Sequence, residues 1–392
     1  MLPAKKHPKA ASEKNKITLT FGLYDPSEWE SGFYNIYDYL KSYVREFNRN
    51  SRRINVEIIS YGPSDDPSSY LKATTAVNSG SMPDLMLVTG LSCERVADKG
   101  YFVDLYEFLE DGDRSSVVDK ADLFSGPLKA MEYDGGLYWI SPEFSLVSFC
   151  GLSSVLGNVE GLTIEGLFDI WKGFDRNKSV FLAYGENRAR AFEIFMSTHI
   201  YKDYIDYKKK TCNFDDQSFI DLLELFATLP NKFPKTPMLQ SHDIVVPEIL
   251  VSEKEAMLCY KELAMLQSLD IVKSCSTDEE IILIGAPWGS DASALCRLKM
   301  PISISSSCKH KEEAWVFLAS LLSNRQRYVF QGTVFPLNRK MLEAHIEEFY
   351  SEYWGLYENG EESVLPYLTC EYSPPFFQLR MLITIIKTHL SV

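Results

Sequence analysis

The chain has 392 residues, of which 45% are hydrophobic, and its mean hydropathy of -0.14 is ordinary for a soluble globular protein. This length exceeds the size at which a single core keeps growing, so about two domains are expected. The formal net charge of -14 argues against a nucleic-acid partner, because binding a polyanion depends on Lys and Arg side chains that neutralise phosphates.

The first segment, residues 1–16 (MLPAKKHPKAASEKNK), is rich in Pro, Ala and Lys and predicts a flexible leader. It lacks the charged, apolar and small-residue zones of a signal peptide. Two accounts stay open: an export signal with its lipid-bearing cysteine was removed, or the protein is cytoplasmic. No apolar stretch reaches the ~18 residues that a membrane-spanning helix needs.

The next segments alternate between the two periodicities of regular structure. Apolar residues alternate where a half-buried strand is expected and recur every three to four residues where an amphipathic helix is expected. Strand, helix, strand, helix and strand are predicted in turn for residues 17–23, 36–47, 54–58, 71–78 and 85–88. This order implies parallel strands joined by right-handed crossovers, and so an open α/β sheet.

A second α/β region is predicted after an extended stretch at residues 137–149. Its expected helices lie around 165–173, 188–199 and 216–228. The chain then runs through predicted strands at 281–287 and 303–307 before a helix at 312–322. Two tryptophans, Trp171 and Trp315, recur at helical spacing with apolar neighbours and are predicted to lie in the core.

The sequence carries no recognisable catalytic or metal-binding motif. The eight cysteines include no C-x-x-C pair, which argues against a structural zinc. Most of the cysteines are expected to be buried thiols, although the sequence does not exclude one disulfide bond. The motifs of serine hydrolases, zinc proteases, P-loop proteins and dinucleotide-binding proteins are missing, and no cofactor is predicted. A glycosidase needs only two suitably spaced carboxylates, so that alternative remains.

Residues 71–105 carry the most specific pattern. A helix is followed by Gly80, then Pro83-Asp84 opens a short apolar strand, and Lys99-Gly100 precedes Asp104-Leu105. This pattern resembles the first-lobe signature of the extracellular solute-binding proteins of bacterial sugar ABC importers, the family that includes maltodextrin-binding proteins. Further similar segments are 47–62, 131–144, 212–230, 249–258 and 309–343, so the resemblance covers roughly residues 17–345.

The resemblance implies a two-lobe periplasmic-binding-protein-like fold of type II, with hinge strands between the lobes. The expected lobes are residues 17–140 plus 300–335 and residues 145–298 plus 337–392. It also implies a carbohydrate ligand held in an inter-lobe cleft that closes on binding, and delivery to the transmembrane subunits of an ABC permease. The protein is then an extracellular monomer, without catalysis, tethered by a lipid anchor that this chain lacks.

Candidate ligand-binding residues lie near strand ends, because open α/β sheets bind ligands outside the carboxyl ends of their strands. Aromatic rings pack against the apolar face of a sugar, and carboxylates accept hydrogen bonds from its hydroxyls. The candidates are Asp25, Trp29, Glu30, Asp84, Glu143, Phe144, Tyr260, Glu262, Trp288 and Asp291. Among them, Trp288 is expected to stack on a sugar ring from the second lobe while Trp29 and Glu30 approach it from the first.

Two other functions fit the same residues. A glycan-degrading enzyme would act through paired carboxylates, and release of reducing sugar would reveal it. A sugar-sensing module would use the same fold without a transporter.

Overall fold

The computed structural model describes most of the chain. The described residues are 16–25, 36–89, 91–110, 118–157, 162–183, 185, 187–196, 204–206, 209–233, 247–263, 272, 275, 279–285, 295–323 and 335–345. The predicted leader therefore lies outside the described residues except for Lys16, whose Nζ donates to the Asn48 carbonyl at 2.8 Å.

The described residues form two compact units, each built from discontinuous segments. The first takes its residues from Met1–Leu123, Met131–Pro142 and Met300–Asn324. The second takes its residues from Phe124–Ala130, Glu143–Lys299 and Arg325–Val392. Each unit combines helices and strands, as predicted.

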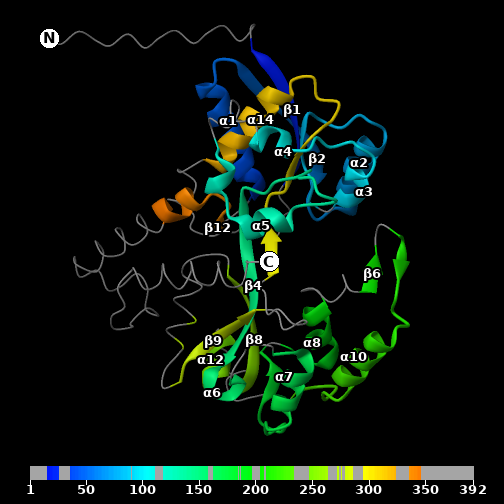
Figure 1. Ribbon diagram of the computed structural model, residues 1–392, viewed down its shortest axis with the longest axis vertical. Coiled ribbons are helices and arrows are strands. Elements are labelled where there is room, and N and C mark those ends of the chain that lie inside the picture. Colours follow the sequence, from blue (N-terminus) through cyan, green and yellow to red (C-terminus); the bar gives the residue numbers. More distant parts are fainter. Residues whose placement is uncertain are drawn as a thin grey trace, which may run out of the picture. The chain divides into compact units, whose positions relative to one another are not determined.

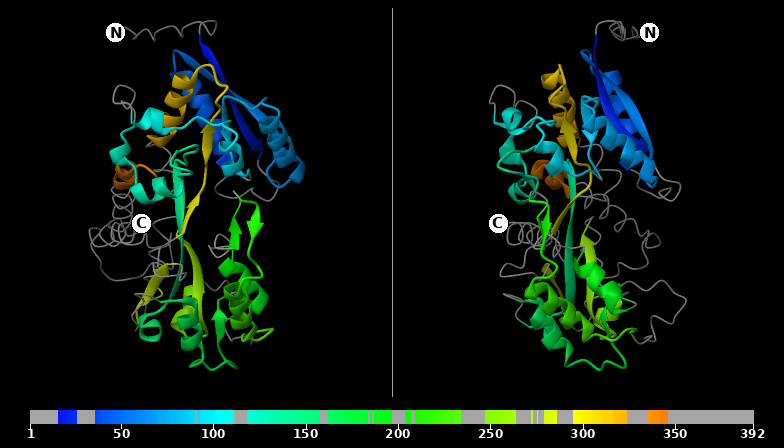
Figure 2. Two further views of the ribbon diagram at one scale, coloured as in Figure 1. Left: turned by 45° about the vertical axis from the view of Figure 1, so that its right-hand side comes forward. Right: turned by 90° about the vertical axis from the view of Figure 1, so that its right-hand side faces the viewer.

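The first unit is built on a four-stranded sheet in the order β11-β3-β1-β2. Figure 1 labels β1 and β2 of this sheet. β1 pairs in parallel with both β2 and β3, and β11 pairs antiparallel with β3. Figure 2 shows β1 and β2 side by side in both views. The elements of this unit are β1 (Ile17–Asp25), α1 (Ile36–Asn50), β2 (Ile54–Pro63), α2 (Pro67–Asn78), β3 (Leu85–Leu87), α3 (Cys93–Ala97), α4 (Tyr106–Leu109), η3 (Lys120–Asp122), β11 (Ile302–Ile304) and α14 (Lys311–Leu322).

Periodicity predicted β1, α1, β2 and β3 correctly, but α2 begins before the predicted start at residue 71. The Asp66 side chain accepts a hydrogen bond from the Ser68 backbone N–H at 2.8 Å, and Pro67 occupies the first helical turn. An Asp cap followed by proline is a strong helix start, because proline has no N–H to leave unpaired.

The structure explains why glycine occupies two positions of the 71–105 pattern. Gly80 (φ 71°) follows α2 and Gly100 (φ 68°) follows α3, so both adopt the left-handed conformation that glycine tolerates best. Their N–H groups donate to the carbonyls of Val77 and Ala97, which closes the helix ends. The two glycines of the pattern therefore mark the ends of α2 and α3, the helices before and after β3.

The second unit is built on a six-stranded sheet with the order β10-β4-β8-β5, in which β9 and β12 also pair with β4. Every residue of β4 is buried, which identifies it as the central strand. The elements of this unit are α5 (Ser125–Ala130), β4 (Glu143–Leu152), α6 (Ser153–Leu156), α7 (Ile164–Trp171), β5 (Val180–Leu182), α8 (Arg188–Phe195), β6 (Ile205–Asp206), β7 (Thr211–Cys212), α10 (Gln217–Ala227), α12 (Pro247–Ser252), β8 (Ala256–Leu263), β9 (Ile281–Gly285), β10 (Leu295–Leu298) and β12 (Phe335–Pro336).

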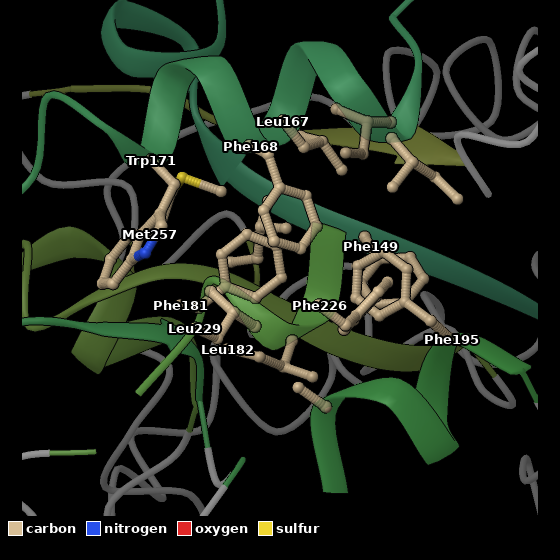
Figure 3. Close-up of a cluster of buried hydrophobic side chains, with 14 of the residues drawn as sticks. Phe149, Leu167, Phe168, Trp171, Phe181, Leu182, Phe195, Phe226, Leu229 and Met257 are labelled. Carbon is tan, nitrogen blue, oxygen red and sulfur yellow. The ribbon is translucent and has the colours of Figure 1, made fainter. Parts of the chain in front are cut away.

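An aromatic core stabilises the second unit (Figure 3). Trp171 is 1% exposed and meets Phe181 edge to face at 5.7 Å between ring centroids, and Phe181 in turn packs against Phe168 at 4.9 Å. In the first unit, Trp315 is 3% exposed and stacks on Phe108 at 5.5 Å. The prediction that both tryptophans are core residues is confirmed.

The end of the predicted first lobe, residue 335, lies instead in the second unit. Phe335 pairs with Phe144 in the register of β12 and β4, and their rings are 5.9 Å apart. A buried aromatic on a central strand of one sheet is part of that sheet's core, so the boundary precedes residue 335. Within the described part of the chain, no helix combines the length and the apolar character needed to cross a membrane.

Candidate functional site

The carboxyl ends of the parallel strands are where an open α/β sheet presents polar groups to a ligand. In the first unit this edge contains Asp25, the last residue of β1, and Ser60, near the end of β2. The Lys41 ammonium lies 2.6 Å from one carboxylate oxygen of Asp25, and the Ser60 hydroxyl donates to the other. Asp25, Lys41 and Ser60 are called the first edge cluster below.

The first edge cluster is balanced in charge and open to solvent. Its Lys41 and Asp25 side chains are 31% and 37% exposed. The hydrogen bond from Lys41, followed by the one from Ser60, lowers the pKa of Asp25 below its ordinary value, so the carboxylate stays charged. Beside it, the buried ring of Tyr24 packs against the Tyr70 ring at 4.9 Å.

In the second unit, strand register brings polar residues onto one face of the sheet. Side chains directly opposite each other on paired antiparallel strands share a face. Ser145 of β4 lies opposite Arg297 of β10, and Phe149 lies opposite Tyr260 of β8. Glu262, the last but one residue of β8, lies opposite Val147 of β4 and therefore on the same face.

These residues form one hydrogen-bonded group centred on the Glu262 carboxylate. One oxygen accepts from the Ser145 hydroxyl at 2.5 Å and from the Lys299 ammonium, and the other accepts from the Arg297 guanidinium at 2.7 Å. Arg297 also donates to the Tyr260 hydroxyl at 3.1 Å. Ser145, Tyr260, Glu262, Arg297 and Lys299 are called the second edge cluster below.

The second edge cluster keeps its central carboxylate charged. Burial raises the pKa of Glu262, but the hydrogen bonds from Lys299 and Ser145 and the charges of Lys299 and Arg297 outweigh it, so that the net shift is downward. The neighbouring Glu143, at the start of β4, behaves oppositely. Its carboxyl is fully buried, and burial raises its pKa well above the ordinary value although the charge of Lys299 acts to lower it.

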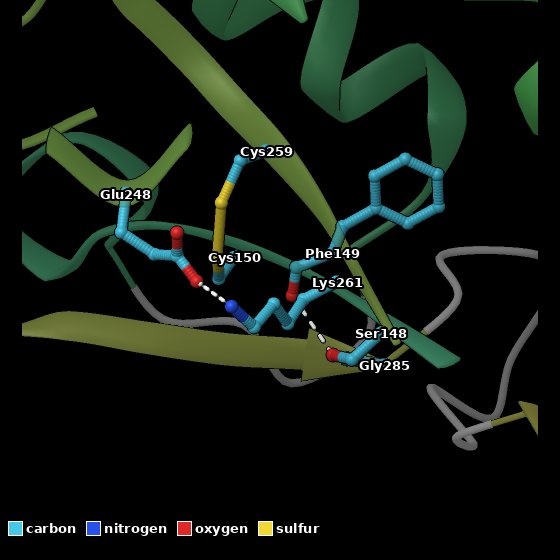
Figure 4. Close-up of a disulfide and its surroundings, with 7 residues drawn as sticks. All are labelled: Ser148, Phe149, Cys150, Glu248, Cys259, Lys261 and Gly285. Atoms are coloured by element: carbon cyan, nitrogen blue, oxygen red, sulfur yellow. Dashed lines mark hydrogen bonds and ion pairs between the residues drawn. A yellow bond between two sulfur atoms is a disulfide. The ribbon is translucent and has the colours of Figure 1, made fainter. Parts of the chain in front are cut away.

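The opposite face of the same strands is structural (Figure 4). Cys150 and Cys259 lie directly opposite on β4 and β8 and form a disulfide with a Cα–Cα distance of 5.3 Å. Next to it, the Lys261 ammonium forms an ion pair with Glu248, whose side chain is 0% exposed. The sequence did not exclude a disulfide, and one is present. It links β4 and β8, two of the strands that carry the second edge cluster.

Two predicted ligand residues have other roles in the structure. Asp84 lies at the amino end of β3, where its carboxylate accepts from the Thr20 N–H at 2.9 Å and from the Thr20 hydroxyl at 2.8 Å. These bonds tie β3 to β1, so Asp84 is not part of the carboxyl edge. Phe144 is 1% exposed and packs between Phe124 and Phe335 at 6.0 and 5.9 Å, so it is a core residue.

The remaining predicted residues divide into two groups. Asp25 lies in the first edge cluster, Tyr260 and Glu262 lie in the second, and Glu143 is buried beside the second. The other four predicted residues lie outside the described residues: Trp29, Glu30, Trp288 and Asp291.

Sequence reasoning missed the cationic members of both clusters. Lys41 lies on α1, and Arg297 and Lys299 lie on or directly after β10. The segment LCRLK at residues 295–299 places the two cations on one face by alternation, which was a readable signal. The pairing of that segment with β4 was not readable.

Comparison with known proteins identifies the fold. No family model and no curated protein matches the sequence. Among solved structures, an extracellular solute-binding protein of family 1 from Alicyclobacillus acidocaldarius matches with a TM-score of 0.54 and 16% identity, over 96% of this chain and 87% of that one.

Two further structures match to a similar extent. The sugar-binding protein MalE from the phytopathogen Xanthomonas citri gives a TM-score of 0.53 at 16% identity, over 86% of this chain and 85% of that one. A periplasmic oligogalacturonide-binding protein from Yersinia enterocolitica also gives 0.53 at 16% identity, over 94% of this chain and 87% of that one. The chain therefore has the two-lobe fold of periplasmic binding proteins, which confirms the fold class predicted from its sequence.

Proposed function

We propose that the protein is the substrate-binding component of an ABC importer, which captures a mono- or oligosaccharide and delivers it to a membrane permease. The observation that carries the proposal is the fold, which is shared over most of the chain with structures described as a solute-binding protein, a sugar-binding protein and an oligogalacturonide-binding protein. Binding without chemical turnover is the activity expected of this class.

The two edge clusters supply the polar groups that such binding requires. A sugar offers hydroxyls that both donate and accept, together with an apolar face. The second edge cluster combines a charged network with the Tyr260 ring, which meets the Phe149 ring edge to face at 5.8 Å. Asp25 provides a carboxylate at the corresponding edge of the first unit. Trp29, Glu30, Trp288 and Asp291 remain proposed ligand contacts.

The protein is proposed to act outside the cytoplasm as a monomer, tethered through a lipid anchor and docking on permease transmembrane subunits. The Cys150–Cys259 disulfide supports an oxidising compartment, because structural disulfides persist mainly in exported proteins. The lobes are proposed to follow the predicted boundaries, residues 17–140 plus 300–335 and 145–298 plus 337–392, except that residue 335 is assigned to the second lobe.

A thermal-shift screen against mono- and oligosaccharides tests the proposal. A ligand at 100 times its Kd should stabilise the folded protein by about 2.7 kcal/mol. A parallel assay for released reducing sugar should stay at background over the same incubation. Failure of every saccharide to shift the melting temperature would overturn the proposal, and steady sugar release would replace it with a glycan-degrading activity.

A further inference from the structure

The second edge cluster has more positive than negative charge. Arg297 and Lys299 are both within ion-pair distance of one carboxylate, that of Glu262. The neighbouring Glu143 does not cancel the difference, because its burial favours the neutral acid. This local excess of one positive charge stands out in a chain whose formal net charge is -14.

Hydrogen-bond donors also exceed acceptors in this cluster. Both oxygens of Glu262 already accept bonds from Ser145, Lys299 and Arg297. Two N–H groups of Arg297 donate to described residues, while its other N–H groups and those of Lys299 have further donor capacity. Tyr260 accepts from Arg297, which leaves its own O–H to donate. A ligand that fits here must therefore bring acceptors.

The cations are also reachable. The side chains of Arg297, Lys299 and Glu262 are 41%, 25% and 24% exposed, so the cluster borders solvent while its members are held by one another. A planar guanidinium held in place is suited to a planar carboxylate, which it can bind through two parallel N–H···O bonds.

We propose that the second edge cluster binds a saccharide that carries a carboxylate, a uronic-acid-containing sugar, with Arg297 and Lys299 contacting the carboxylate and Tyr260 donating to a ring or hydroxyl oxygen. This inference rests on the proposed function and specifies its substrate class. Glu262 is a positioning residue, because it holds both cations.

The test measures binding of matched acidic and neutral ligands by calorimetry on the full chain. The probes are short oligomers of galacturonate, glucuronate and mannuronate, each paired with its methyl ester, which removes the charge and keeps the sugar. At least one acid should bind at least ~10-fold tighter than its ester, and raising the salt concentration should weaken the acid more than the ester.

Variants then assign the preference to the cluster. Arg297→Gln should remove most of the preference for the acid. Arg297→Lys keeps the positive charge but not the two parallel N–H donors of the guanidinium, so it should retain part of that preference. Arg190→Gln is the matched control, because Arg190 is a 52% exposed cation in the same unit paired with Glu193. Melting temperatures of the unliganded variants establish that each is folded.

The outcomes separate this inference from the proposed function. Neutral saccharides that bind as tightly as their acids would overturn the inference and leave sugar binding standing. An acid preference unchanged by Arg297→Gln would overturn the assignment to this cluster, as would tighter binding of galactose 1-phosphate than of any uronate. If neither acids nor esters bind, the proposed function fails and the inference with it.

Discussion

The two units place a carboxylate at the same topological position but surround it differently. Among the residues that the structure describes, Asp25 in the first unit has one cationic partner, Lys41, whereas Glu262 in the second has two. The first pair is open to solvent and electrically balanced, and the second is more enclosed and carries an excess positive charge. The sheet therefore determines where polar groups gather, while the number of cations around the carboxylate determines the net charge of the cluster.

The second unit also carries stabilising features that the described part of the first does not show. Its central strand is buried along its whole length, and a disulfide joins that strand to its neighbour. An enclosed charged network requires a rigid support, because buried charges must be held close to their partners.

Truncating the central aromatic of the second unit should have the largest effect. Trp171→Ala removes a ring that packs against Phe174, Phe181 and Phe233, so the free energy of unfolding should fall by about 3–5 kcal/mol. Urea denaturation followed by circular dichroism measures it. Lys172→Ala, at a 68% exposed neighbour, should change stability by less than about 0.5 kcal/mol. A loss below about 1 kcal/mol for Trp171→Ala would contradict its role in the core.

Removing the disulfide should have the next largest effect. Replacing both Cys150 and Cys259 by serine opens a link between residues 109 apart in sequence, so stability should fall by about 2–4 kcal/mol. Cys212→Ser is the control, because that cysteine is exposed and free. Equal melting temperatures for the double variant and the control would show that the second unit does not depend on this cross-link.

Neutralising the carboxylate at the centre of the second edge cluster should lower the free energy of unfolding by about 1–3 kcal/mol at pH 7. Glu262→Gln leaves Arg297 and Lys299 without their shared anion, and bonds between charged groups contribute on this scale. Because the folded state lowers the pKa of Glu262, the stabilisation is present above the ordinary pKa of 4.5 and is lost as the pH falls below it. Denaturation at several pH values should therefore show wild type and variant converging in acid. A difference that persists in acid would assign the loss to packing instead.

Glu143 should give the opposite pH dependence. Burial raises the pKa of Glu143, so the folded protein holds this proton more tightly than the unfolded chain does. The resulting contribution to the free energy of unfolding is fully present below the ordinary pKa of 4.5 and is lost as the pH rises toward the folded-state pKa. In that range, wild-type stability should fall by at most about 1.4 kcal/mol per pH unit, and Glu143→Gln should flatten the curve. Glu57→Gln, at an exposed position of β2, should leave the curve unchanged. An unchanged slope in Glu143→Gln would show that this carboxyl is already ionised in the folded protein.

Much of the fold was predictable, because the signals for strands and helices are local. The alternation that begins at Ile17 predicts β1, and the helical spacing around Trp171 predicts α7. Members of the two edge clusters were predictable only near the end of a strand, where Asp25 is the last residue of β1 and Glu262 the last but one of β8.

The partners of those residues were not predictable, because strand register is not readable from one sequence. Ser145 and Arg297 meet only because β10 pairs with β4 in one particular alignment. The same limit explains Asp84, whose bonds to Thr20 depend on the pairing of β3 with β1. The core position of Phe144 was unpredictable for a related reason, since every residue of β4 is buried and alternation cannot separate its faces.

The smallest effect is expected at the first edge cluster and completes the comparison. Asp25→Asn removes an ion pair whose side chains are 31% and 37% exposed, so it should cost less than about 1 kcal/mol at pH 7. Because exposed charges are screened, this cost should shrink further between about 0.05 and 1 M salt, while the cost of Glu262→Gln should respond less. Parallel urea denaturation of the two variants at both salt concentrations measures this difference. Equal costs and equal salt responses would mean that enclosure and the second cation give Glu262 no added stability, and the distinction between the two edges would then lie in ligand recognition alone.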